Sequence, residues 1–544
     1  MSFPQNAFQS DLPEQIPWSV ILEKLRHNDM SFGLHVDLLH MLRNIDKELE
    51  NPDSDLELMQ THMLRLETHQ KSLRSLLSAP IRALPPEILG TIFWMYVDEA
   101  RGIHLYHDNF PQSVPANTLG AVCYHWRNVT LSIPFLWTTM DITLIPVCHT
   151  TFLDLLLARS CTQELRMPLD VTITCNTTSD WQVFDCPLLT TLVCQCYRWH
   201  RITFRTPHDI LDAPVFSPIR ANLNCLQFLS VAWESRENFE VDPLPHKAWN
   251  LFEYAPHLTE VEIFTPIYQF ALPWSSITSV RSVIWAGNDS NPRRDLSLCC
   301  HAQSLFLQLS CGLDEPQNPG AYPDLHCKSL ELDLAEYAWA VDLKGYSDCF
   351  QMLSCPRLEA LTISNTCPSM SSSEFTFPLN PLHSFCFLQK EHLRSLSIKD
   401  IAFTESYALI SILNGLPQLE HLSVQELSNT KGQEFVKRRQ ILNASVLQGL
   451  TAFRTFDKGF IPFLPRLKSL ELGFTCPSYV TVTDLVRLIE SRWLPLGAVD
   501  GVVCIGEVIL HWDKAGNAVD LLRPLKNAGL EIALYNRVGG LRLL

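Results

Sequence analysis

Residues 356–363 read PRLEALTI and contain the pattern that recurs most clearly in this chain of 544 residues. The pattern is Leu-x-x-Leu-x-(Leu/Ile/Val) with a proline two positions before the first leucine. Good copies lie at 256–263, 417–424 and 465–472, and weaker ones at 189–194, 226–231, 330–334 and 393–398. Side chains alternate across a strand, so the second leucine and the aliphatic residue two positions after it point to the same side. One such unit cannot bury its apolar face, and the pattern therefore predicts stacked parallel strands, a solenoid.

Helical patterns fill the intervals between these strands. Residues 151–159, 407–413 and 486–492 have the spacing of outer helices, whereas the polar runs 288–295 and 314–323 indicate loops. Two further strands, at 508–510 and 530–534, with a helix over 521–528 between them, would close the array. We therefore expect an α/β domain over residues 141–544. The unit resembles a degenerate leucine-rich repeat, with spacing often longer than the usual range of roughly 20 to 29 residues.

On each strand, the residues between the inward pairs would face the other side of the sheet. We hypothesise that they contact a target protein, while the alternative is a solvated polar face. The positions concerned are Thr259, Glu260, Glu262, Glu359, Ala360, Thr362, Glu420, His421, Ser423, Lys468, Ser469 and Glu471.

Ahead of the repeats, residues 81–137 predict two short amphipathic helices. Residues 84–93 read LPPEILGTIF, where proline suits the first turn of a helix and the apolar residues recur three and four apart. A second helix is expected from Val122 to Ile133, because Val122, Cys123, Trp126 and Val129 repeat that spacing and a proline follows.

These segments, with VCYHWR at 122–127 and PFLW at 134–137, resemble in order an F-box of the variety common in mushroom-type fungi. The insert over 98–117 departs from the shortest F-boxes. The resemblance implies docking onto the Skp-type adaptor of a cullin-RING ubiquitin ligase. It assigns the adaptor-binding face to ten residues: Leu84, Pro85, Glu87, Ile88, Leu89, Ile92, Phe93, Val122, Cys123 and Trp126.

The first 79 residues form a leader to this F-box-like domain, which we delimit as 80–140. Residues 1–30 mix polar residues with isolated hydrophobes and suggest a disordered tail. Over 31–79, Leu38, Leu42, Ile45 and Leu49 give one helix a coiled-coil-like seam, Pro52 interrupts it, and a second helix follows. The leader could self-associate, or it could fold back as a helical hairpin.

Composition limits the remaining possibilities. The formal charge of −16, from 42 basic and 58 acidic residues, argues against nucleic acid as a partner. The 18 cysteines lack paired zinc-ligand spacing, and His104 with His107 is a weak metal motif, so no metal or cofactor is expected. Neither a secretory signal nor a membrane span is apparent, which predicts an intracellular protein, cytoplasmic or nuclear.

The sequence as a whole thus predicts an α+β multidomain protein. A helical leader and a small all-α F-box-like domain precede a leucine-rich-repeat-like domain that would bind a target protein. No phosphate-binding loop, dinucleotide motif or catalytic triad motif is present, so we expect a substrate-recognition subunit of a Skp-cullin-F-box ligase and not an enzyme. Two alternatives stay open: a non-enzymatic scaffold in which the F-box-like helices only cap the solenoid, and an enzyme with an unrecognised site.

Overall fold

The computed structural model describes residues 23, 32–50, 64, 66–71, 74, 81, 84–100, 102–105, 111–144, 150–161, 166–175, 186–206, 208–232, 249–265, 267–285, 292–310, 322–334, 350, 353–365, 379–401, 407–426, 441–452, 463–474, 480–493, 502–512, 516–536, 542 and 544. The chain separates into two units, Met1–Arg201 and Ile202–Leu544. Strand β5 (Trp199–Arg205) contains the division. The expected boundaries after residues 30, 79 and 140 stay predictions.

In the leader, helix α2 (Phe32–Glu50) buries Leu38 and Ile45. A second helical segment contacts it, because Gln70 Nε2 donates to Asp46 Oδ1 at 2.5 Å and Arg74 Nη2 lies 3.4 Å from the same oxygen. These contacts are of the kind that the hairpin alternative requires. The predicted tail and the side chain of Leu49 lie outside the described residues.

Several short helices follow in the first unit: α4 (Pro86–Glu99), α5 (Pro115–Val122), α6 (Tyr124–Ser132), η2 (Pro134–Trp137), α7 (Thr151–Arg159), α8 (Pro187–Val193) and η4 (Cys196–Arg198). The single helix predicted over 122–133 is wrong, since Val122 ends α5 and α6 begins at Tyr124. Cys123 between them is extended (φ −158°, ψ 171°), and its Sγ accepts the Trp126 N–H at 3.4 Å, which caps α6.

Among the described residues of the first unit, four strands precede β5. Strand β1 (Ile103–Leu105) pairs antiparallel with β2 (Pro111–Ser113) and parallel with β3 (Thr139–Thr143), which pairs parallel with β4 (Leu169–Thr174). The strand predicted at 189–194 is wrong, because these residues belong mainly to helix α8. Pro187 occupies its first turn, and its buried residues recur at helical spacing: Leu188, Leu189, Leu192 and Val193.

In the second unit, consecutive strands pair parallel, each with the one before and the one after it. They are β6 (Phe228–Ala232), β7 (Glu260–Ile263), β8 (Ser279–Trp285), β9 (Ser304–Ser310), β10 (Ser329–Asp333), β11 (Ala360–Ser364), β12 (Ser395–Lys399), β13 (His421–Gln425), β14 (Ser469–Gly473), β15 (Glu507–His511) and β16 (Glu531–Tyr535). The register aligns one buried aliphatic residue per strand, from Leu330 through Leu361, Leu396, Leu422 and Leu470 to Val508 and Ile532.

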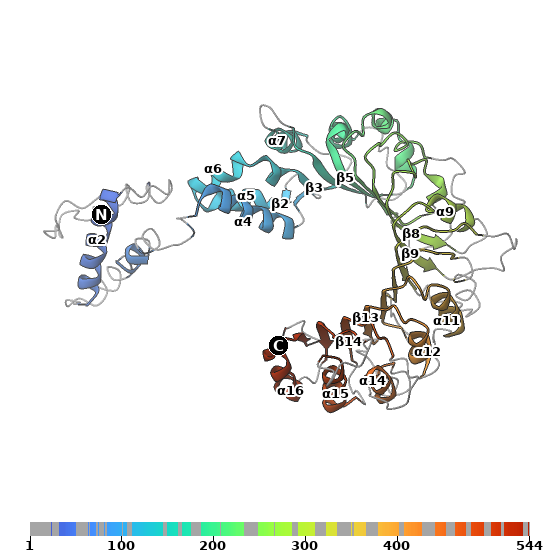
Figure 1. The fold of residues 1–544 in the computed structure, drawn as a ribbon. Coiled ribbons are helices and arrows are strands. Elements are labelled where there is room, and N and C mark those ends of the chain that lie inside the picture. The colour runs from blue at the N-terminus through green and yellow to red at the C-terminus, as the bar shows by residue number, and fades with distance from the viewer. Residues whose placement is uncertain are drawn as a thin grey trace, which may run out of the picture. The chain divides into compact units, whose positions relative to one another are not determined.

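Helices of the second unit lie on one side of these strands, which leaves the other side of the sheet open (Figure 1). They are α9 (Pro292–Leu298), α11 (Leu379–Leu388), α12 (Ala408–Asn414), α14 (Ala444–Leu450), α15 (Val482–Trp493) and α16 (Gly516–Asn527), with the 3-10 turns η5 (His208–Asp212), η6 (Pro214–Ala221) and η7 (Ile267–Gln269). The loop predicted over 288–295 is wrong at its end, where α9 begins at Pro292. The protein is therefore a mixed helix-and-strand structure with a parallel sheet, in agreement with the predicted α+β class.

Candidate protein-docking surface

Helix α4 is apolar on two faces, and only one face is covered. Leu89, Phe93 and Val97 recur four apart and are buried. Ile88, Ile92 and Met95 are 49%, 40% and 61% exposed, and they recur four and three apart. We call these three residues the α4 stripe. A stripe of large aliphatic side chains at helical spacing is the pattern that normally packs against a partner.

The buried face of α4 is fixed by close packing. The Phe93 and Trp126 ring centroids are 4.8 Å apart with the rings tilted by 56°, which joins α4 to α6. A Cβ atom at Gly90 would lie 2.7 Å from Ile133 Cδ1, so this glycine allows the chain before η2 to approach the helix closely. Such packing determines which side of α4 faces outward.

Neighbouring helices expose more apolar surface. Val122 at the end of α5 is 59% exposed and Tyr124 at the start of α6 is 44% exposed. The helix junction itself is held by the Cys123 cap and by Arg127, whose Nε donates to the Gly120 carbonyl at 3.0 Å. The two helices are therefore rigidly joined where Val122 and Tyr124 protrude.

The ten residues that the resemblance assigned to the adaptor face occupy three kinds of environment. Five are exposed: Pro85, Glu87, Ile88, Ile92 and Val122. Three are partly exposed: Leu84, Cys123 and Trp126. The remaining two, Leu89 and Phe93, are completely buried and lie beneath the surface of the helix.

Sequence reasoning missed several exposed apolar residues in the same region: Trp94, Met95, Tyr96, Tyr124, Leu131 and Phe135. A signal was present at 92–97, where six consecutive apolar or aromatic residues read IFWMYV. A run that long is wider than one buried stripe of a helix, so part of it must face outward.

The open face of the second unit's sheet bears a polar network centred on Glu471 of β14. Ser423 Oγ and Gln425 Nε2 donate to the Glu471 carboxylate at 2.8 and 2.7 Å, and His511 Nε2 lies 3.0 Å from it. Burial opposes ionisation of Glu471, but these three hydrogen bonds prevail and lower its pKa below the ordinary value. The carboxylate is thus held charged and oriented on the strand face.

A second set of charges follows the residues just before the strands. The Lys468 ammonium hydrogen-bonds to Glu420, which lowers the pKa of that carboxyl, and Arg394 lies 3.7 Å from its other oxygen. The Lys468 and Arg394 side chains are exposed, whereas that of Glu420 is only 16% exposed, so the two ion pairs lie at the protein surface, where such pairs contribute little to stability. The hypothesised target-contacting residues Glu420, Ser423 and Glu471 therefore already have intramolecular partners.

Within the described ranges, no group of three histidine, cysteine or acidic side chains could hold a metal ion. Those ranges include His104 but leave out His107. No helix among the described residues combines the length and the apolar character that crossing a membrane requires.

Comparison with known proteins adds no relative to this description. No family model matches the chain, and no curated protein matches it significantly.

Proposed function

We propose that this protein is the substrate-recognition subunit of a Skp-cullin-F-box type ubiquitin ligase. The F-box-like helices α4 to α6 would bind the Skp-type adaptor, and the leucine-rich-repeat-like solenoid would bind a target protein. The protein itself would perform no covalent chemistry, since its contribution is to hold the target near a ubiquitin-loaded enzyme.

The observation that carries the adaptor proposal is the α4 stripe. Burying a side chain such as isoleucine contributes roughly 1.5 to 3 kcal/mol when it passes from full exposure to full burial. Ile88, Ile92 and Met95 are about half exposed, so roughly half of that gain is still available to a partner from each residue. Three such residues in one row form a plausible centre for a protein interface.

The buried members of the predicted face have a different role in this proposal. Leu89 and Phe93 hold α4 against α6 through the Phe93–Trp126 contact, and they thereby orient the stripe. Replacing either of them would impair folding of the helical region, whereas replacing the stripe residues, which are about half exposed, would mainly impair binding.

The target-binding proposal is supported by the open strand face of the second unit. Successive parallel strands in register, with helices on the other side, give the long polar surface that solenoid proteins use to bind protein ligands. Candidate contacts are the strand residues that point away from the helices, among them Glu262 and Thr362.

The decisive experiment measures binding of the full-length protein to a purified Skp-type adaptor by calorimetry. The variant Ile88→Ala/Ile92→Ala should lose at least about 2 kcal/mol of binding free energy, a factor of about 30, because it truncates two central contacts. Leu155→Ala is the matched control, since Leu155 is a 43% exposed leucine on α7. Because the two isoleucines are about half buried, the double variant should also lose some melting temperature, and circular dichroism should show that both variants are folded at the assay temperature.

Failure of the folded wild-type protein to bind the adaptor would refute the ligase proposal. The protein would then be an interaction scaffold, and helices α4 to α6 would resemble an F-box in their fold but not in adaptor binding. That alternative requires Leu84 and Ile88 to be covered within the chain, whereas Ile88 is 49% exposed.

A further inference from the structure

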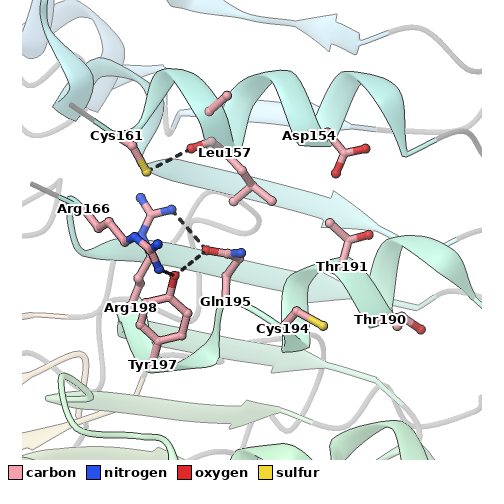
Figure 2. Close-up of a pocket in the computed structure, with 11 residues that line it drawn as sticks. Asp154, Leu157, Cys161, Arg166, Thr190, Thr191, Cys194, Gln195, Tyr197 and Arg198 are labelled. Carbon is pink, nitrogen blue, oxygen red and sulfur yellow. Dashed lines mark hydrogen bonds between the residues drawn. The ribbon is translucent and has the colours of Figure 1, made fainter. Parts of the chain in front are cut away.

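A pocket of about 670 Å³ in the first unit is independent of the docking surface. It lies between α7 and the segment that contains α8 and η4, and Figure 2 shows the side chains that line it. Two arginines, Arg166 and Arg198, lie near one end, whereas Asp154 lies away from them in the same view. Of these two arginines, Arg166 is exposed.

The two arginines belong to one hydrogen-bonded network of four side chains. Arg166 Nη1 donates to the Tyr197 hydroxyl, and its guanidinium lies 5.5 Å from the centre of the Tyr197 ring. The Tyr197 hydroxyl in turn donates to Gln195 Oε1 at 3.1 Å, and Arg198 Nη1 approaches the same oxygen at 3.4 Å. The network therefore connects two cations through neutral groups.

Arg198 is held rigidly at the base of this network. It is 3% exposed, and it donates from Nε to the Met167 carbonyl at 2.9 Å and from Nη2 to the carbonyl and hydroxyl of Ser160 at 3.1 and 2.7 Å. These bonds give Arg198 a structural role, because they tie η4 to Ser160 and Met167. They leave Nη1 directed at Gln195, on the pocket side, as Figure 2 shows.

No carboxylate among the described residues lies within ion-pair distance of either arginine. Burial lowers the pKa of Arg198, whereas Cys161 and Tyr197 oppose this shift and the positive charge of Arg166 adds to it. Two guanidinium groups at one end of a pocket, one exposed and one buried, create a positive potential that favours an anionic ligand. Arg166 bonds to the Tyr197 hydroxyl and lies near its ring, and because it is exposed it is also accessible to a ligand.

We propose that this pocket binds a phosphate monoester group. A phosphate monoester carries a charge of about −1.5 to −2 at neutral pH and three acceptor oxygens, which match two guanidinium groups better than a monocarboxylate does. Arg166 donates to the ligand from the exposed side and Arg198 Nη1 from the buried side. The Thr191 hydroxyl, further along the pocket, and the Gln195 amide supply neutral hydrogen bonds.

The test titrates inorganic phosphate into the full-length protein at constant ionic strength, followed by calorimetry and phosphorus NMR. Saturable binding is expected, and Arg166→Ala should weaken it by at least about tenfold because a charge-assisted contact is lost. The phosphate affinity of Arg166→Lys should lie between those of the wild type and Arg166→Ala. Arg205→Ala, which removes an exposed arginine on β5 outside the pocket, should bind like the wild type.

Two further probes distinguish the sources of the group. Phenyl phosphate and a phosphoserine peptide should each compete with inorganic phosphate, and the tighter of them identifies a small metabolite or a modified protein as the natural source. Binding that does not saturate in the millimolar range, or equal affinity in the wild type and Arg166→Ala, would overturn the proposal. The variant Ile88→Ala/Ile92→Ala should retain phosphate binding, so failure here and failure of the adaptor proposal are separable.

Discussion

Arg492 of α15 offers the most quantitative test of what holds the second unit together. Its side chain is completely buried, and its guanidinium donates to three backbone carbonyls outside its own helix. Nε reaches the Leu450 carbonyl at 2.5 Å, Nη1 the Leu464 carbonyl at 3.0 Å and Nη2 the Phe463 carbonyl at 2.7 Å. Burial lowers its pKa to about 10, which still leaves the group protonated at pH 7.

Replacing Arg492 with methionine keeps much of the aliphatic volume and removes all three donors. The Leu464 carbonyl also accepts the Leu467 N–H at 3.4 Å and keeps that partner. The Leu450 and Phe463 carbonyls lose the hydrogen bond from the guanidinium. An unsatisfied buried acceptor costs about 1 to 3 kcal/mol, while relief of the guanidinium desolvation offsets part of the loss. We expect the free energy of unfolding to fall by about 3 kcal/mol.

Urea unfolding of the full-length protein measures this loss, with Arg487→Met as the matched control. Arg487 lies on the same helix and is exposed. Because a chain with two units need not unfold in one step, amide exchange over 441–452 and 463–474 should locate the effect. A loss for Arg492→Met within about 1 kcal/mol of the control, without faster exchange in these segments, would refute the reasoning.

Two further predictions concern single residues. Burial raises the pKa of Asp295 to about 7, although its carboxylate accepts the Tyr268 N–H at 2.9 Å. The unfolded carboxyl ionises near pH 4, so this group makes the protein less stable as pH rises from about 4 to about 7. In thermal unfolding, Asp295→Asn should therefore gain melting temperature relative to the wild type across that interval, and parallel curves would contradict this cause. Gly102 has φ of +80°, and a Cβ there would lie 2.6 Å from the Thr139 carbonyl oxygen. Gly102→Ala should lower the free energy of unfolding by more than the roughly 1 to 3 kcal/mol of backbone strain alone. Gly529→Ala, at φ +105° with open space around the Cβ, should cost only that strain, and equal losses in the two variants would show that the contact is unimportant.

The sequence predicted strands best where the complete leucine pattern occurs. Strands β7, β11, β13 and β14 coincide with the four good copies, because each copy specifies both the turn and the two inward side chains. Strand β4 was missed although Leu169, Val171 and Ile173 alternate and are buried, since no leucine pattern precedes it. The segment 189–194 was misassigned because LTTLVC fits the repeat and a short helix equally well.

The sequence alone does not determine which face of α4 is exposed. Ile88 and Leu89 are adjacent aliphatic residues, as are Ile92 and Phe93, so helical periodicity permits either member of each pair to be buried. Packing against Trp126 and Ile133 decides the choice, and those residues lie more than thirty positions further along the chain. The pocket beside α7 could not be predicted for the same reason, since Arg166 and Arg198 come from segments that only the fold brings together.

From β6 to β16, each parallel strand pairs in register with its neighbours in chain order. No strand of this series depends on a contact with a distant one, so a whole repeat could be gained or lost by duplication or deletion within a gene while the neighbouring strands rejoin in the same register. The length of the open strand face is then an evolutionary variable that changes in steps of one strand. Related chains with more or fewer strands would differ in how many side chains this face can present, with helices α4 to α6 unaltered.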